Sequence, residues 1–519
     1  MLSITDIVVV VVYATSLFVL AQLVSRERAG HKKNAKDYFL ASGSLPWWAI
    51  GASLIAANIS AEQIIGMSGS GYAIGLGIAS YEWMAAITLV LVGKFLLPIF
   101  LKNGIYTMPQ FLEQRYDHNV RMVMAFFWLG VYVFVNLTSI LWLGALAIKT
   151  VAGLDLVYGL VFLGLFAIAY SIYGGLKAVA FTDIIQVVLL VLGGLLIAWI
   201  MLDKVSDGSG VIAGFGVLVE RAPEKFDMIL SPDNPHYISL PGISVLIGGM
   251  WIMNISYWGF NQYIIQRALA AKSIHEAQKG IAFAAFLKLL MPVIVVLPGI
   301  AMFVLSPNLP APDQAYPSAM TLLPSGIKGL VFAALLAAIV SSLASMINSI
   351  STIFTMDIYV SMVAEEKQAN RVVVGRIVAT CAMLLAMVCA KPLLGNFDQA
   401  FQYIQEFTGF FTPGIVVIFL LGMFWKKTTS LGALVAAIAS AVLSFGLKLA
   451  WPELPFIDRV GIVFLSCAFI AIVLSIVQGN REQPGAVDLE GIDFSTTSGF
   501  NVAGIAVALI LAALYATWW

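Results

Sequence analysis

The stretch Ala56-Ala57-Asn58-Ile59-Ser60-Ala61-Glu62-Gln63 lies in the middle of an apolar segment that is long enough to cross a membrane. Two carboxamides, a hydroxyl and a carboxylate within six residues do not suit an unbroken helix that faces lipid. A second apolar segment contains Met253-Asn254-Ile255-Ser256-Tyr257-Trp258-Gly259-Phe260-Asn261-Gln262, which repeats the triplet Asn-Ile-Ser five spans later. Because five is odd, the two segments cross the membrane in opposite directions. We therefore predict two interrupted helices at matching places of an inverted repeat, with simple helix packing as the alternative explanation of so short an echo.

The composition of the whole chain points to a membrane protein. Of the 519 residues, 61% are hydrophobic and 11% are charged, whereas an ordinary soluble domain has about 25% charged residues. The 28 basic and 28 acidic residues cancel, so no basic surface favours nucleic acid. Three cysteines in apolar runs predict neither a disulfide framework nor a zinc site, and four histidines without an HExxH pattern argue against a metalloprotease. The predicted fold class is an all-α polytopic membrane protein.

Hydropathy predicts about 14 membrane-spanning helices. They lie at 5–24, 47–72, 79–101, 120–150, 155–174, 178–202, 241–266, 275–305, 327–360, 372–394, 398–424, 428–449, 458–478 and 500–519. The longest polar stretch runs only from about Asp203 to Leu240, so we expect residues 1–519 to form a single membrane domain.

The distribution of basic residues predicts the orientation of the chain. No Lys or Arg precedes the first span, whereas Arg26, Arg28, Lys32, Lys33 and Lys36 follow it, which is typical of a retained helix rather than a signal peptide. If residue 1 is outside, 18 basic residues fall in cytoplasmic loops and 8 in outer loops, and the remaining 2 of the 28 lie within spans. This bias favours both termini outside the cytoplasm.

Charged and hydroxylated side chains inside the spans are the candidates for function. Glu62, Glu82, Asp183, Lys288 and Glu406 lie at depths where a charge costs at least ~2.5–3.5 kcal/mol, so each marks either a functional site or a structural ion pair. The ninth span contains Ser341, Ser342 and Ser345. These hydroxyls either mediate close helix packing or contribute to an all-oxygen cage for a hard monovalent cation.

Several long stretches are similar to those of a known family. They are residues 37–41, 45–71, 81–84, 170–176, 258–263, 286–289, 341–345 and 402–406. On these stretches nearly the whole chain resembles the solute:sodium symporter family, and most closely its bacterial sodium/galactose members. The resemblance implies a LeuT-like core of ten helices in two inverted repeats, 47–202 and 241–424, with one extra helix at 5–24 before it and three helices at 428–519 after it.

The resemblance also implies a sugar site. Its hydrogen-bonding residues would be Gln63, Glu82, Asn254, Lys288 and Gln405. Tyr257 would stack beneath the sugar ring as the inner gate, and Met67, Tyr81 and Phe401 would close the outer side. These residue types suit a neutral pyranose, whose hydroxyls need carboxylate, amide and ammonium partners and whose C–H face needs an aromatic plane. Glu82 and Lys288 would partly neutralise each other's buried charge.

A cation site follows from the same resemblance. It would consist of the backbone carbonyls of Ala56, Ile59 and Ala338 and the hydroxyls of Ser341 and Ser342, with Asp183 on the path of the ion. Relatives that use two sodium ions have a further hydroxyl where this chain has Ala344, so we expect one Na⁺ per sugar. Two positions depart from the galactose symporter pattern: Ala85 replaces a serine at the sugar site, and Ser256 replaces a tyrosine beside the inner gate. The sugar class is therefore better determined than the sugar.

The predicted function is sodium-coupled secondary active symport that imports a neutral hexose of the galactose/glucose type by alternating access. Na⁺ would be the coupling ion, with no organic cofactor and no enzyme activity, and the partners would be the sugar, the ion and the lipid bilayer of a bacterial inner membrane. The oligomeric state stays open. The alternatives are another small solute, such as an inositol, a sialic acid or proline, a membrane-embedded glycosyltransferase, or a transporter-like sugar sensor.

Overall fold

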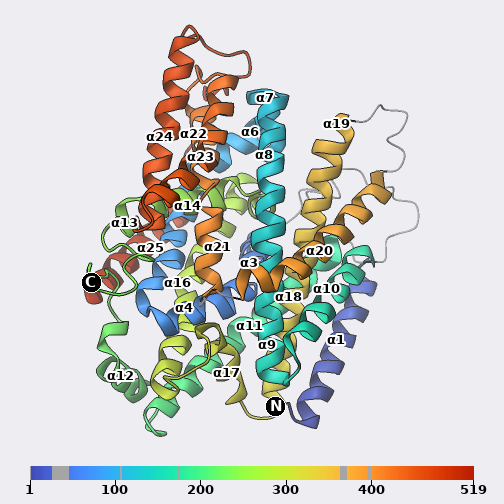
Figure 1. Cartoon of the computed structure of the whole chain (residues 1–519), viewed down its shortest axis with the longest axis vertical. Coiled ribbons are helices and arrows are strands. Elements are labelled where there is room, and N and C mark those ends of the chain that lie inside the picture. The colour runs from blue at the N-terminus through green and yellow to red at the C-terminus, as the bar shows by residue number, and fades with distance from the viewer. Residues whose placement is uncertain are drawn as a thin grey trace.

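The computed structural model is a bundle of helices, most of which run along the long axis of the molecule (Figure 1). It describes residues 2–25, 46–105, 108–173, 176–362, 371–395, 397 and 399–519. At one side α1 and α20 pack against α18, and at the other α22, α23 and α24 pack against one another. Between these two groups, α16 packs against α3, α4 and α5.

The helices of the first half of the chain are α1 (Ile4–Ser25), α3 (Trp47–Asn58), α4 (Met67–Ala73), α5 (Ser80–Leu91), α6 (Leu97–Lys102), α7 (Met108–Arg115), α8 (His118–Val131), α9 (Thr138–Ala152), α10 (Leu156–Tyr173), α11 (Leu176–Val205), α12 (Val211–Arg221), α13 (Ser244–Ile247) and α14 (Gly249–Ile255). Those of the second half are α15 (Gln262–Leu269), α16 (Ile274–Leu305), α17 (Ala315–Thr321), α18 (Ile327–Thr352), α19 (Val360–Met362), α20 (Arg371–Leu394), α21 (Ala400–Thr408), α22 (Thr412–Phe424), α23 (Ser430–Ala450), α24 (Phe456–Val477) and α25 (Ser498–Thr517). Wider π turns join several of them, at η2 (Glu62–Gly66), η4 (Val92–Leu96), η5 (Tyr132–Leu137), η7 (Ser256–Phe260) and η9 (Ile353–Tyr359), and short 3₁₀ turns are η3 (Leu76–Ala79), η6 (Pro223–Lys225) and η8 (Pro312–Gln314).

The helices account for the apolar segments of the sequence. Among the described residues, nine helical stretches are long and apolar enough to cross a membrane alone, and two bent helix pairs bring the number to 11. The three other predicted spans coincide with α1, with α10 and with the short helices α14 and α15. The predicted bounds are close where the hydropathy is uniform: the eighth span was expected at 275–305 and α16 covers Ile274–Leu305.

The second span is interrupted where the Asn-Ile-Ser triplet predicts it. Helix α3 ends at Asn58, Ile59 has an extended backbone with φ −73° and ψ 93°, and the helix resumes at Glu62. The two halves of the span are bent by 66° relative to each other. The break leaves carbonyl groups at the end of α3 without the helical donors that a continuous span would supply. The negative end of the α3 dipole points into the same place, which favours a cation.

The seventh span is also interrupted, but later than the triplet suggests. Asn254 and Ile255 lie in α14 and Ser256 begins η7, so the chain stays helical through the triplet. The break comes at Asn261, which has an extended backbone with φ −82° and ψ 115°. The eleventh span has a bend that the sequence did not reveal, of 46° between α21 and α22.

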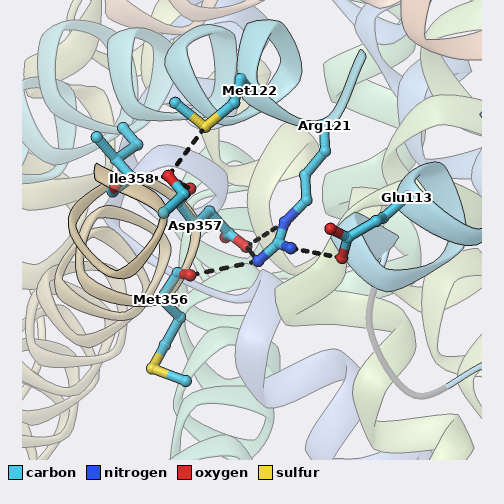
Figure 2. A network of polar contacts seen from close by, with 7 residues as sticks. Glu113, Arg121, Met122, Met356, Asp357 and Ile358 are labelled. Carbon is cyan, nitrogen blue, oxygen red and sulfur yellow. Dashed lines mark hydrogen bonds and ion pairs between the residues drawn. The ribbon is translucent and has the colours of Figure 1, made fainter. Parts of the chain in front are cut away.

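Two groups of charged residues hold helix ends together. Arg121 at the start of α8 donates to Asp357 in η9 from Nε at 2.9 Å and from Nη2 at 2.5 Å, and its Nη1 lies 2.5 Å from Glu113 in α7 (Figure 2). Glu406 in α21 pairs with Lys448 in α23 at 2.8 Å and with Arg459 in α24 at 3.1 Å. Of the charged residues that the sequence places inside spans, Glu406 therefore takes the structural role.

The last helix braces the third span. The hydroxyl of Tyr515 in α25 donates to Ser80 Oγ of α5 at 3.0 Å, and the ring of Tyr515 meets the Trp83 ring edge-on, with centroids 6.1 Å apart. Near the end of the chain, the carbonyl of Trp518 accepts a hydrogen bond from the backbone N–H of Met228 in the loop before α13. Ser80 and Trp83 stand on either side of Glu82 in the sequence, so α25 supports the turn that carries this carboxylate.

Candidate functional site

A cavity lies between the interrupted helices and α5, α8, α16, α21 and α22. The volume of this cavity is about 110 Å³. One water needs only ~10–15 Å³, so the cavity has the size of a small solute. All five residues predicted for the sugar site line it, namely Gln63, Glu82, Asn254, Lys288 and Gln405. They come from η2, α5, α14, α16 and α21, which lie far apart in the sequence. The five residues that the family resemblance implied for the sugar site therefore lie around one cavity in the fold.

A buried ion pair forms part of the wall of this cavity. Lys288 Nζ lies 2.5 Å from Glu82 Oε2, and the two side chains are 0% and 2% exposed. The same ammonium donates to Asn58 Oδ1, and it lies 5.0 Å from the centre of the Trp258 ring. The expected mutual neutralisation of Glu82 and Lys288 is thus present in the structure. Because the ammonium and the carboxylate are paired, together they add no net charge to the wall, which also contains the carboxylate of Glu62.

The carboxamides of the cavity still have hydrogen-bonding capacity for a ligand. Gln63 donates through Nε2 to Glu82 Oε1 at 2.9 Å, while its own Oε1 is buried and has no hydrogen-bond partner among the described residues. Asn254 donates from Nδ2 to the carbonyl of Met250 at 3.1 Å, one turn back along α14. A buried acceptor without a partner costs ~1–3 kcal/mol, so a ligand hydroxyl that donates to Gln63 Oε1 would stabilise the site.

Three of the four predicted gate residues reach the cavity. Tyr257 lines it, and its hydroxyl accepts from Asn58 Nδ2 at 3.1 Å and lies 2.9 Å from the hydroxyl of Tyr263. Tyr81 and Phe401 also line it and meet edge-on, with ring centroids 5.1 Å apart. Met67 is fully buried and lies outside the cavity wall. Met67 is therefore not part of the cavity wall, and its role as an outer gate stays a prediction.

A second, smaller cavity lies beside the break in the second span. Its volume is about 30 Å³, which is enough for one or two waters or for a cation. All five residues predicted for the cation site line it, namely Ala56, Ile59, Ala338, Ser341 and Ser342. Ser345, one turn further along α18, lines it as well. Carbonyls and hydroxyls of this kind coordinate Na⁺ at interrupted helices.

Four residues line both cavities and form the wall between them: Glu62, Asn136, Tyr257 and Asn261. Asn136 Nδ2 donates to Glu62 Oε1 at 3.5 Å, and the Tyr132 hydroxyl donates to Asn261 Oδ1 at 2.9 Å. Sequence reasoning gave no role to Asn136 and Tyr132. Their signal is weak, because a lone carboxamide and a lone tyrosine in the fourth span resemble packing residues until the fold places them opposite the break.

Of the three remaining residues named from the sequence, two line the larger cavity and one has a side chain outside the described residues. Ala85 and Ser256, the two departures from the galactose symporter pattern, both line the larger cavity, so both contribute to its shape. Asp183 belongs to α11, but its side chain lies outside the described residues.

Comparisons with known proteins agree with this architecture. The family model described as "Sodium:solute symporter family" matches residues 38–440. The sodium/glucose cotransporter of Vibrio parahaemolyticus is 51% identical, over 100% of this chain and 99% of that protein. The sodium/myo-inositol cotransporter 2 of Mus musculus is 33% identical, over 84% of this chain and 69% of that protein.

A solved structure is similar over almost the same length. It is a Na⁺-coupled sialic acid symporter in a substrate-bound, outward-open state, with a TM-score of 0.77 and 26% identity over 92% of this chain and 98% of the other. The predicted class, an all-helical polytopic membrane protein with interrupted helices, is confirmed by this likeness and by the two broken spans. The family match extends from before the first interrupted helix into α23 and includes every residue predicted for the two sites. The chain therefore belongs to the sodium:solute symporter family and is a membrane transporter rather than an enzyme.

Proposed function

We propose that the protein imports a neutral hexose of the galactose or glucose type together with Na⁺, by alternating access. The observation that carries this proposal is the pair of adjacent cavities: one of solute size with paired charges and carboxamides, and one of ion size with carbonyls and hydroxyls. In this proposal Gln63, Glu82, Asn254, Lys288 and Gln405 bind the sugar hydroxyls. Ala56, Ile59, Ala338, Ser341 and Ser342 hold the ion.

The charge of the larger cavity supports a neutral cargo. A carboxylated solute such as a sialic acid or proline needs a free cation, and the ammonium of Lys288 is already occupied by Glu82 at 2.5 Å. A sugar hydroxyl instead gains from the same pair, because it donates to a carboxylate and accepts from an ammonium. The ring of Tyr257 offers the aromatic plane against which a pyranose packs its C–H face.

Coupling requires that Na⁺ binds one conformation better than the other, since an ion with equal affinity for both shifts nothing. A cation between α3 and α18 joins the broken span to the ninth span and favours the state that is open to the outside. Loss of the ion to the cytoplasm, along a path that includes Asp183, then releases α3. Tyr257, which lies in the wall between the cavities, moves and lets the sugar leave.

A stoichiometry of one Na⁺ per sugar sets a limit on accumulation. One charge moving through 100 mV supplies ~2.3 kcal/mol, and a tenfold Na⁺ gradient adds ~1.4 kcal/mol. The sum allows the sugar to be concentrated about 500-fold. Steady accumulation far above this ratio in vesicles under these conditions would require more than one ion. We further propose that both termini face the outside of a bacterial inner membrane, as the basic residues predict.

The test is uptake of labelled galactose and glucose into proteoliposomes, with Na⁺ replaced by K⁺ or by a pH gradient. We expect accumulation only with Na⁺, and equal accumulation without it would refute the proposal. Gln405→Ala should abolish uptake, whereas Gln402→Ala is the matched control. Both glutamines lie in α21, but Gln402 does not line the cavity and makes no hydrogen bond within the described chain.

The ion site has its own matched pair. Ser342→Ala should raise the Na⁺ concentration needed for half-maximal uptake, because Ser342 lines the smaller cavity. Ser349→Ala is the control on the same helix, since the Ser349 hydroxyl donates to the carbonyl of Ser345 at 3.0 Å and lies outside the cavity wall. Equal Na⁺ dependence in the two variants would overturn the assignment of Ser342.

A cyclic polyol is the second candidate substrate. It is favoured by the 33% identity to a sodium/myo-inositol cotransporter and by Ala85, whose methyl group offers no hydrogen bond to a sugar. Competition of unlabelled myo-inositol with labelled hexose in the same vesicles decides between the two candidates.

A further inference from the structure

Glu62 has a place in the structure that the two proposed sites leave unexplained. It is the first residue of η2, immediately after the break in the second span. Among the described residues it is the only acidic one that lines both cavities, because Glu82, the other acidic residue of the larger cavity, does not line the smaller one. Glu62 therefore borders both the proposed ion site and the proposed sugar site.

The charge of Glu62 is not balanced by a bonded cation. In the described part of the chain it forms no ion pair, and its side chain has one hydrogen bond, from Asn136 Nδ2 at 3.5 Å. Glu82, in contrast, is paired with Lys288 at 2.5 Å. Among the described residues, the one basic residue that lines the smaller cavity is Arg267 in α15, and its guanidinium has other hydrogen-bond partners. Its Nε donates to Ser53 Oγ at 2.9 Å and its Nη1 to the carbonyl of Tyr263.

The proposed ion ligands are neutral, so the smaller cavity needs a source of negative charge. Carbonyls and hydroxyls supply partial charges only, whereas a nearby carboxylate attracts a cation strongly where little water screens it. An unpaired carboxylate in the membrane interior is itself costly, and a bound cation offsets that cost. We propose that Glu62 is the counter-charge of the coupling cation and that it also presents this charge to the sugar cavity. This inference rests on the proposed Na⁺ coupling.

The position of Glu62 links the two ligands. When the cation is bound, the negative charge facing the sugar cavity is compensated; when it leaves, the carboxylate is uncompensated again. The polar environment of the sugar thus changes with the occupancy of the ion site, with no need for contact between the ligands. The phenols of Tyr257 and Tyr263, which also line the smaller cavity, carry no charge that could replace the carboxylate.

The test measures Na⁺ binding directly, without transport. Purified protein in detergent is heated in NaCl or in choline chloride at equal ionic strength and without sugar, and the stabilisation by Na⁺ gives its Kd. Glu62→Gln keeps the shape and the bond with Asn136 but removes the charge. We expect its Kd for Na⁺ to rise about tenfold, which corresponds to ~1.4 kcal/mol. Glu62→Asp, which keeps the charge, should stay within about threefold of the original protein.

A second variant, which removes a positive charge instead of a negative one, should change the Kd for Na⁺ in the opposite direction. Arg267→Gln removes a positive charge from the same cavity, so its Kd for Na⁺ should fall, whereas a purely structural role of these side chains would weaken binding in both variants. The inference is overturned if Glu62→Gln binds Na⁺ as tightly as the original protein, or if Glu62→Asp loses as much affinity as Glu62→Gln. If Glu62→Gln does not fold, a rise in the Kd of Arg267→Gln overturns it instead. Absence of any Na⁺ stabilisation in the original protein would refute the proposed sodium coupling rather than the role of Glu62.

Discussion

The ion pair of Lys288 and Glu82 permits a sharp test of the larger cavity. Both side chains are essentially inaccessible, with exposures of 0% and 2%, and their charged atoms lie 2.5 Å apart. Lys288→Met removes the ammonium and, within the described part of the chain, leaves Glu82 with the hydrogen bond from Gln63 at 2.9 Å as its only side-chain bond. Breaking a buried pair from one side costs ~3–5 kcal/mol, because the remaining charge is uncompensated. Glu82→Gln should cost a similar amount for the same reason.

The double variant separates this charge effect from simple loss of packing. Without either charge, no uncompensated charge remains in the wall, and the amide oxygen of glutamine at position 82 can still accept the hydrogen bond from Gln63, while Asn58 loses its bond with the ammonium. We therefore expect Lys288→Met combined with Glu82→Gln to be more stable than either single variant. The assay is thermal unfolding of the three purified variants in detergent. Sugar uptake should be absent in all three.

A matched control is available at the other ion pair. Lys448→Met removes an ammonium that lies 2.8 Å from Glu406, but Lys448 is 35% exposed and Arg459 remains as a partner. An exposed pair contributes ~0–1 kcal/mol, so this variant should unfold at nearly the original temperature.

If the double variant at positions 82 and 288 loses as much stability as the sum of the two single losses, the interpretation of the pair as mutually compensating charges is refuted.

Three further predictions concern the proposed gate, the loop before α13 and the backbone. Tyr257→Phe removes the hydroxyl that bonds to both Asn58 and Tyr263. Release of sugar from preloaded vesicles should therefore be about tenfold faster, which corresponds to ~1.4 kcal/mol. The control is Tyr316→Phe, which should leave release unchanged because the buried hydroxyl of Tyr316 has no partner among the described residues. Burial and the charge of Lys225 lower the pKa of His236 below its ordinary value of 6.5. The neutral form of His236 therefore stabilises the folded protein fully above pH 6.5, and this stabilisation is lost as the pH falls through the lowered pKa. Unfolding temperatures measured between pH 7.5 and 5 should therefore fall more for the original protein than for His236→Asn, and equal slopes would contradict this assignment. Gly75 has φ 109°, and a Cβ there would lie 2.4 Å from the carbonyl of Lys225, so Gly75→Ala should lower the unfolding temperature. Gly216→Ala in α12, with no atom within 4 Å of the added Cβ, should not, and a comparable loss in both would remove the steric argument.

The break in the second span was predictable because its cause is local. Asn58, Ser60 and Glu62 put polar groups at mid-membrane, where a straight helix would expose them to lipid, and the chain bends by 66° at that point. The break in the seventh span was placed too early, because the polar run there extends to Asn261 and Gln262 and nothing local shows where it ends. Ser256 is accommodated in the π turn η7, so the helix continues past the triplet.

The sites show the same division between local signals and those that depend on the fold. The five residues predicted to bind sugar come from five different elements, so only the family resemblance named them together. Met67 follows Gln63 by four residues, a spacing that puts two side chains on one face of an α-helix. Gln63 lies within the π turn η2 and Met67 is the first residue of α4, yet Met67 is fully buried and is not among the residues that line the cavity, which the spacing alone does not show. The bend between α21 and α22 lies between Gly409 and Pro413, residue types that often mark helix ends, but the span was predicted as one continuous apolar segment.

The contact between α25 and α5 bears on how the protein can be shortened or fused to other proteins. Tyr515 contacts Ser80 and Trp83, which flank the proposed sugar-binding carboxylate of Glu82, although its helix lies outside the predicted ten-helix core. A version trimmed to that core would still have every residue proposed to bind a ligand, but the turn that carries Glu82 would lack its contact with α25. Reporter domains attached after Trp519 therefore call for a flexible spacer, so that their bulk does not pull on the helix that steadies Glu82.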